Sequence, residues 1–213
     1  MGQLLPSRTP NRTRRRNRRG RRALPAAAVA LALLAGCSTG PGAVDVSNGG
    51  EFRFVAGTPA GEVIPEEARA SAPDFAGTLL DGEAFDSASL AGEVAVLNFW
   101  GSWCAPCRVE TPAFSEVSEE YADDGVRFLG VDVKETDEQF ALAFVDRFGI
   151  AFPSLYDPRG EVALAFRDYP ANAIPSTIVL DPRYRVAAVY TGAVQEDDLR
   201  RVLDRVLAEE DAA

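Results

Sequence analysis

Two cysteines separated by two residues are the part of this sequence best suited to chemistry. The segment Trp103-Cys104-Ala105-Pro106-Cys107 follows a short apolar run and opens a predicted helix. Unpaired N–H groups and the dipole at a helix N-terminus favour an anion, so we expect the pKa of Cys104 to fall below the ~8.5 of a free thiol. Cys107 follows three residues later, about one helical turn along the chain, so its sulfur can lie beside the sulfur of Cys104. One sulfur can attack a disulfide and the other can resolve the mixed disulfide, so the spacing predicts thiol–disulfide exchange.

Other uses of a cysteine pair fit this sequence less well. The chain has one further cysteine, Cys37, and no histidine, whereas a structural zinc site usually takes about four Cys or His ligands, so we predict no metal. Covalent haem attachment requires a histidine where Arg108 stands. A purely structural disulfide would close so short a loop that it would constrain the unfolded chain little. The lack of histidine also excludes Ser-His-Asp and Cys-His hydrolases. Two cysteines are enough for the whole exchange cycle, so we predict the redox-active disulfide Cys104–Cys107 and no added cofactor.

The first 36 residues have the composition of an export signal. Nine arginines between Arg8 and Arg22 precede the apolar stretch 23–36, ALPAAAVALALLAG. At ~1.5 Å per residue this stretch is shorter than the ~30 Å hydrocarbon core, which favours a secretory signal over a membrane span. Residues 34–37, LAGC, resemble a bacterial lipobox, which implies that Cys37 becomes the lipidated first residue of the mature chain. A signal with an incidental cysteine is the alternative, and both Sec and twin-arginine export stay open.

The chain therefore divides into three predicted parts. These are a lipoprotein signal peptide over 1–36, the lipidated Cys37 with a tether or extended segment over 37–70, and a folded domain over 71–213. Beyond the signal, 13 basic residues stand against 32 acidic ones, a net charge of −19. Such an acidic body argues against nucleic acid or anionic lipid as a direct partner. The predicted location is extracytoplasmic, with the lipid on Cys37 as the anchor to the cell membrane.

From residue 72 onward, apolar runs alternate with amphipathic stretches. Such runs predict buried strands, and apolar residues spaced by three or four predict helices. The predicted strands are 94–99, 126–133, 152–156, 176–180 and 186–190, with a further short strand at 52–55. The predicted helices are 104–121, 137–148, 161–166 and 196–207. In the second of these, Phe140, Phe144, Val145 and Phe148 share one face. This order predicts an α/β fold with a mixed central sheet flanked by helices.

Several motifs of the predicted domain occur together between residues 72 and 207. They are 72–75 (APDF), 97–108 (LNFWGSWCAPCR), Glu110, Pro112, 148–150 (FGI) and 174–181 (IPSTIVLD). In this combination they resemble the TlpA/ResA group of membrane-tethered thioredoxin-like proteins. The resemblance implies a thioredoxin-like fold with a central insertion, roughly Lys134–Arg167 here. It also implies disulfide reduction outside the cytoplasm, which in several members serves cytochrome c maturation.

The resemblance assigns roles to single residues as well. Pro175 takes the position of the group's cis-proline, which faces the cysteine pair and presents backbone to the substrate; an ordinary trans turn is the alternative. Glu110 takes the position of a glutamate that tunes the active-site thiols. A carboxylate near a buried thiol can accept its proton, and burial would raise its pKa toward neutrality; a solvated helix position is the alternative. Trp103 either shields the disulfide beside the substrate or has a plain core role. Asn98 stands where cytoplasmic thioredoxins carry a buried aspartate.

The expected activity is therefore reduction of disulfides in exported proteins, with apocytochrome c as the first candidate. Electrons must then come from a membrane thiol donor, because the domain shows no nucleotide-binding glycine pattern. A net oxidant that forms disulfides is the main alternative, since dithiol proteins span reduction potentials from about −270 to about −120 mV. A thiol peroxidase, suggested by residues 72–75, and a non-enzymatic tethered binding module are further alternatives.

Overall fold

The computed structural model describes residues 62–210. The predicted signal peptide, Cys37, most of the predicted tether and the strand expected at 52–55 lie outside these residues. Over the described part of the chain, no helix combines the length and the apolar character that a bilayer crossing requires.

Five strands form the central sheet, in the order β5-β4-β3-β6-β7. Their bounds are Val94–Trp100 for β3, Val126–Val133 for β4, Ser154–Asp157 for β5, Ser176–Leu180 for β6 and Val186–Thr191 for β7. β3, β4 and β5 run parallel, whereas β6 is antiparallel to both β3 and β7. The sheet is mixed, which confirms the prediction, and all five predicted strands of the domain are present.

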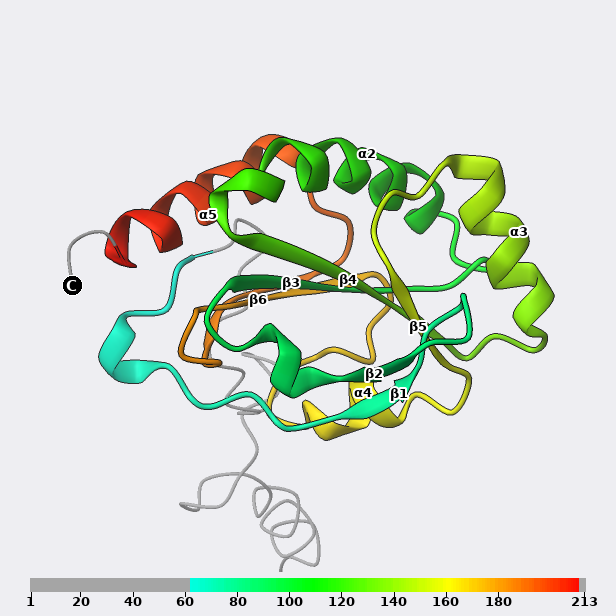
Figure 1. Cartoon of the computed structure of the whole chain (residues 1–213), viewed down its shortest axis with the longest axis horizontal. Helices are drawn as coiled ribbons and strands as arrows, with labels where there is room; N and C mark the ends of the chain where they lie inside the picture. The colour runs from blue at the N-terminus through cyan, green and yellow to red at the C-terminus, as the bar shows by residue number, and fades with distance from the viewer. Residues whose placement is uncertain (1–61, 211–213) are drawn as a thin grey trace, which may run out of the picture. The chain divides into compact units, whose positions relative to one another are not determined.

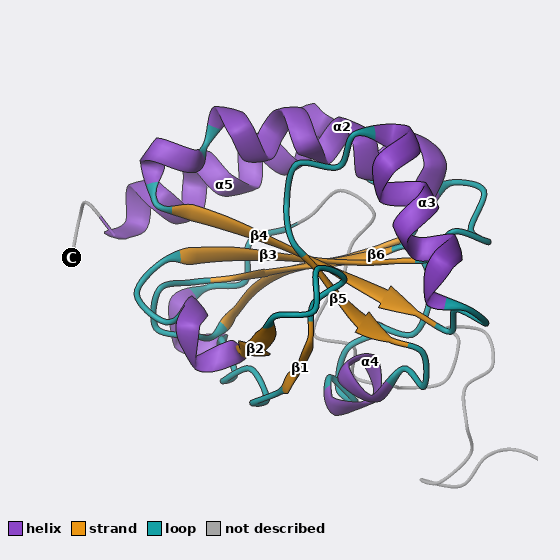
Figure 2. Ribbon diagram, turned by 45° about the vertical axis from the view of Figure 1, so that its right-hand side comes forward, coloured by secondary structure: helices purple, strands orange, loops and turns teal. Residues whose placement is uncertain are grey.

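Helices cover both faces of this sheet. They are Cys107–Glu120 (α2), Glu138–Phe148 (α3), Glu161–Ala165 (α4) and Glu196–Glu210 (α5). Figures 1 and 2 show α2, α3 and α5 on one side, with α4 and a two-stranded hairpin on the other. The hairpin consists of β1 (Ala76–Thr78) and β2 (Ala84–Asp86). The segment predicted as an insertion supplies α3, the edge strand β5 and α4.

The alternation of side chains along β3 explains why this strand lies at the centre. Val94 and Val96 belong to the apolar cluster that includes side chains of α2 and α5. Leu97 and Phe99 point to the opposite face, where Phe99 contacts Phe166 edge-on with ring centroids 6.0 Å apart. Every residue of β3 is buried, as expected for a strand covered on both faces. The end of β3 is thereby held firmly, and the cysteine loop begins there.

The structure corrects the predicted elements at two places and adds contacts at a third. Helix α2 starts at Cys107 and not at Cys104, because Pro106 lies at its N-cap and a proline disfavours helical geometry in the residue before it. The β1–β2 hairpin was not predicted, since strands of three residues leave almost no periodic signal. Part of the predicted tether lies against the domain: Val63 and Arg69 are buried, and Arg69 forms an ion pair with Asp181.

Candidate functional site

A disulfide joins Cys104 and Cys107 in the loop between β3 and α2. Their Cα atoms are 5.3 Å apart. Cys104 is 4% exposed and Cys107 is fully buried, so the two sulfurs differ in their access to a partner. Attack on another disulfide requires that access, which makes Cys104 the better placed of the two.

The start of α2 is directed at the sulfur of Cys104. The backbone N–H of Cys107, the first residue of α2, donates a hydrogen bond to Cys104 Sγ over 3.2 Å. Cys104 therefore precedes the helix and does not belong to its first turn, which differs from the predicted placement. The electrostatic consequence is the same, because the unpaired donors and the positive end of the helix dipole face this sulfur. Once the disulfide is reduced, these groups favour the thiolate of Cys104 over the thiol.

The disulfide lies against a small apolar cluster. Trp100, Ala141 and Phe144 are buried with the two cysteines, and the Trp100 and Phe144 rings stack with centroids 4.6 Å apart. Phe148 and Ile174 pack against the same cluster. Residues from β3, from α3 and from the segment before β6 thus enclose the cysteine loop.

The Ile174–Pro175 peptide bond is cis, as the family resemblance implied for Pro175. The carbonyl of Pro175 accepts a hydrogen bond from the N–H of Gly192 over 2.9 Å, which links the start of β6 to the end of β7. Ile174, next to Pro175, contacts the cluster that holds the disulfide. The structure therefore brings Pro175 to the same end of the sheet as the cysteines.

Trp103 lies at the surface and has no core role. Its side chain is 48% exposed, and its Nε1 donates a hydrogen bond to the carbonyl of Val133 over 3.1 Å. Gly101 makes this position possible, because a Cβ built at residue 101 would lie 2.4 Å from Trp103 Nε1. The side chain is therefore fixed beside the cysteines while about half of it stays exposed to solvent.

Glu110 is buried in the first turn of α2, so the solvated position considered as an alternative is wrong. The residue is 3% exposed. Its Oε1 accepts from Asn98 Nδ2 over 2.8 Å, and its Oε2 accepts from the N–H of Val194 over 2.6 Å. Burial raises the pKa of Glu110 from 4.5 to about 7, although the two hydrogen bonds act in the opposite direction. A carboxyl with this pKa can hold or release a proton near neutral pH.

Three polar residues surround Glu110, of which the sequence pointed to Asn98 but not to Thr111 or Thr177. Asn98 Nδ2 also donates to Thr177 Oγ1 over 3.3 Å, and Thr111 Oγ1 donates to Asn98 Oδ1 over 3.3 Å. Asn98, Thr111 and Thr177 are fully buried, so each must find its partner within the protein. This network connects β3, α2 and β6 and fixes the direction of the Glu110 side chain. The one sign of this network in the sequence was Asn98, a polar residue within an apolar strand.

Two acidic residues after β4 and at its end were also not identified from the sequence. Glu135 is buried, and its Oε2 accepts from the N–H of Ser102 over 3.0 Å, which supports the start of the cysteine loop. Asp132, paired with Trp100 across the sheet, is fully buried. Burial and the nearby carboxylates Glu135, Asp157 and Glu138 raise the pKa of Asp132 from 3.8 to about 8. In the sequence, Asp132 stands out only as an acidic residue within an apolar run, and Glu135 has no such signal.

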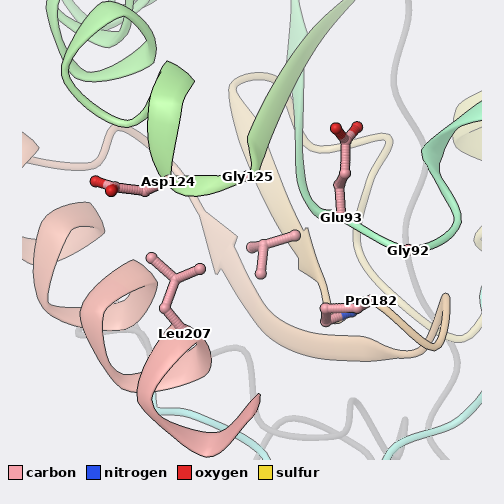
Figure 3. Close-up of a pocket in the computed structure, with 7 residues that line it drawn as sticks. Gly92, Glu93, Asp124, Gly125, Pro182 and Leu207 are labelled. Carbon is pink, nitrogen blue, oxygen red and sulfur yellow. The ribbon is translucent and has the colours of Figure 1, made fainter. Parts of the chain in front are cut away.

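Hollows lie at both ends of the sheet. One, of about 460 Å³, lies between the loops before β3 and β4 and the last turns of α5, where Glu93, Asp124 and Leu207 line it (Figure 3). It contains no cysteine and lies at the opposite end of β3 from the disulfide. Another, of about 330 Å³, lies beside the cysteine loop between α2 and α3.

Within the described part of the chain, no group of three His, Cys, Asp or Glu side chains could hold a metal ion.

Proteins similar to this chain in sequence include a thiol–disulfide oxidoreductase, which agrees with the cysteine pair described above. Residues 68–189, more than half of the chain, match the AhpC/TSA family. The chain is 34% identical over 136 residues to the thiol–disulfide oxidoreductase ResA of Geobacillus kaustophilus, a match that covers 64% of this chain and 76% of that protein.

Solved structures of proteins with related names are also similar to this chain. A DsbF homologue from Corynebacterium diphtheriae is 36% identical, with a TM-score of 0.65 over 70% of this chain and 94% of that one. A secreted thiol–disulfide isomerase from Corynebacterium glutamicum is 33% identical, with a TM-score of 0.66 over 70% of this chain and 92% of that one. The fold, the cysteine loop and these matches together show that the chain belongs to the AhpC/TSA family, within the ResA-like group of thioredoxin-like proteins.

Proposed function

We propose that this chain is an extracytoplasmic thiol–disulfide oxidoreductase that reduces disulfides in exported proteins. The observation that carries the proposal is the Cys104–Cys107 disulfide, with the N–H at the start of α2 directed at Cys104 Sγ. The names of the ResA relative and of the secreted isomerase support the reaction class and the location outside the cytoplasm.

The proposed cycle begins with the reduced pair. The Cys104 thiolate attacks one sulfur of the substrate disulfide and forms a mixed disulfide, while the other substrate sulfur leaves as a thiolate. Cys107 then loses its proton and attacks Cys104 Sγ, which releases the second substrate sulfur and forms the Cys104–Cys107 disulfide. Two electrons have passed to the substrate. A membrane thiol donor must return two electrons to the pair before the next cycle.

Glu110 is the proposed acceptor of the Cys107 proton. Both residues lie on α2, three positions apart, and both are buried. The pKa of Glu110, about 7, suits a group that takes up a proton and returns it near neutral pH. Trp103 and Pro175 are proposed to contact the substrate chain beside the disulfide, because both lie around the cysteine loop.

A disulfide exchange assay tests the proposal. Reduced wild-type protein should reduce insulin disulfides far faster than the Cys104→Ser variant, in which the attacking sulfur is absent. Cys107→Ser should instead accumulate the mixed disulfide, visible by mass spectrometry, because the resolving step is lost. Equal rates for wild type and Cys104→Ser would exclude the proposed activity and favour the alternative, a non-enzymatic binding module.

The direction of the reaction depends on the reduction potential of the cysteine pair. A value of about −270 mV supports a reductase, whereas a value of about −120 mV supports a net oxidant of exported proteins.

Apocytochrome c is the first proposed substrate, and its reduction by the purified protein tests that choice directly. Consumption of hydrogen peroxide at a comparable rate would favour a thiol peroxidase instead.

The anchor is proposed from the sequence motif at Cys37. Lipidation there would hold the domain at the outer face of the membrane, within reach of exported substrates. Wild-type protein should then sediment with membranes and carry a diacylglycerol mass on Cys37, whereas Cys37→Ala should be found in the soluble fraction. A Cys37→Ala protein that still sediments with membranes would refute this anchor.

A further inference from the structure

A groove beside the cysteine loop differs in charge from the rest of the domain. Its volume is about 330 Å³, and its lining contains two arginines and no carboxylate. The lining residues are Ser102, Arg108, Phe140, Ala143, Phe144, Arg147 and Phe148. A positive groove is unexpected on a chain that carries a net charge of −19 beyond its predicted signal.

Neither arginine of the groove forms an ion pair with a carboxylate of residues 62–210. Eight of the twelve basic residues between 62 and 210 form ion pairs with carboxylates of that region. Arg108 instead donates to the carbonyl of Ser102, and Arg147 lies over the Phe148 ring at 5.7 Å. Both side chains are exposed, so their charges are available to a bound anion.

The groove is also apolar, and it is continuous with the active site. Phe140 is 56% exposed, although it shares one face of α3 with the buried Phe144. Phe144 is part of the buried cluster that holds the disulfide, and Phe148 packs against that cluster. Of the four large apolar side chains exposed between residues 62 and 210, Phe140 lines this groove, Trp103 belongs to the cysteine segment and Val109 lies on α2 next to Arg108.

We propose that this groove binds an extended segment of the protein substrate that carries an aromatic side chain and acidic residues next to the reacting cysteine. The aromatic side chain would pack on Phe140 and Phe148, and the carboxylates would meet Arg108 and Arg147. This proposal rests on the proposed function and adds to it a class of substrate. It predicts selection of acidic segments, opposite to what the net charge of the chain would select.

Two matched peptides test this selection. Each contains phenylalanine and one cysteine activated as a thiopyridyl disulfide; one has glutamates and the other lysines at the flanking positions. Reduced wild-type protein should react with the acidic peptide with a kcat/KM on the order of tenfold higher, as release of thiopyridone reports. Because exposed charges are screened at high ionic strength, about 1 M NaCl should remove most of this preference.

Charge reversal at one arginine of the groove should weaken or abolish the preference. Arg147→Glu should lower the ratio of acidic to basic kcat/KM by about three- to tenfold, since an exposed ion pair becomes a like-charge contact. Arg167→Glu is the matched control, because Arg167 is exposed and outside the groove and also lacks an ion pair with a carboxylate of the described region. It should leave the ratio unchanged. Phe140→Ser should lower kcat/KM for both peptides by a similar factor, on the order of fivefold, without changing their ratio.

The small disulfide 4,4'-dithiodipyridine separates the two proposals. If it reacts no faster with wild type than with Cys104→Ser, the proposed function fails. If it reacts quickly while the two peptides react at equal rates, or if Arg147→Glu and Arg167→Glu behave alike, the groove proposal fails and the proposed function stands. A second copy of this chain is the other possible occupant of the groove, and sedimentation velocity tests it. A dimer that dissociates in the Arg147→Glu variant would show that a second copy fills the groove. This result would also overturn the proposal.

Discussion

Two buried carboxyl groups near the end of β3 are held in opposite ways. Glu110 has a hydrogen-bond donor on each oxygen, Asn98 on one and Val194 on the other. Asp132 is fully buried, and neither of its oxygens has a hydrogen-bond partner among the described residues. The first arrangement fixes a carboxyl in a defined direction, whereas the second leaves its charge without compensation.

The difference appears in proton affinity. Burial raises the pKa of both groups, to about 7 for Glu110 and to about 8 for Asp132, and only Glu110 has hydrogen bonds that counteract the rise. A raised pKa means that the folded state binds the proton more tightly than the unfolded state. The free energy of unfolding should therefore fall as the pH rises from about 4 through 7 and 8. The two carboxyl groups are thus distinguished by their hydrogen-bond partners more than by their burial.

Asp132→Asn should have the largest effect on stability. Asparagine cannot ionise, so the variant avoids the uncompensated buried charge that Asp132 acquires above pH 8. At pH 8.5 we expect the variant to be more stable than wild type by on the order of 3 kcal/mol. At pH 4 both side chains are neutral in the folded state, and urea unfolding should give nearly equal values. A variant less stable than wild type at pH 8.5 would show that Asp132 has a compensating partner.

Glu110→Gln should stabilise less and should change the chemistry. The amide removes the buried charge but has one acceptor oxygen for the two donors, Asn98 Nδ2 and the Val194 N–H, so the expected gain at pH 8.5 is only about 1 kcal/mol. The rate of disulfide exchange in wild type should change around pH 7, and Glu110→Gln should lack that change. Asp132→Asn serves as the control and should retain it. An unaltered pH profile in Glu110→Gln would exclude Glu110 as the proton acceptor.

Thr177→Val should have the smallest effect of the three. It removes the 3.3 Å hydrogen bond from Asn98 to Thr177 Oγ1 but keeps the shape of the side chain and the bond from Asn98 to Glu110. The expected loss of stability is about 0.5–1 kcal/mol in urea unfolding. Because Glu110 stays held, the pH profile of exchange should not move. A shifted profile would show that the hydroxyl network, and not Asn98 alone, sets the proton affinity of Glu110.

Much of the fold was predictable because the strands are buried on both faces. Runs such as Val94–Phe99 and Val126–Val133 give a strong local signal, and the helices around them show regular apolar spacing. A local pattern does not show which residues the rest of the fold covers. Phe140 fits the apolar stripe of α3, yet its side chain is 56% exposed, whereas Phe144 on the same stripe is buried.

The candidate site was predictable to a different degree for each residue. Cys104 and Cys107 followed from their spacing, and the cis bond at Pro175 and the burial of Glu110 followed from the family resemblance. Neither source indicated Asp132, since an acidic residue in an apolar run does not tell which way its side chain points.

The amino-acid sequence by itself determined the reactive pair, the order of strands and helices and the acidic character of the chain. These properties depend on residue types and on distances along the chain. Only the tertiary structure decided which sulfur is more accessible, which polar groups hold Glu110 and where two arginines meet exposed aromatic rings. Those features join residues that are far apart in the sequence, such as Glu110 and Val194, and only the packing of helices on the sheet brings them together.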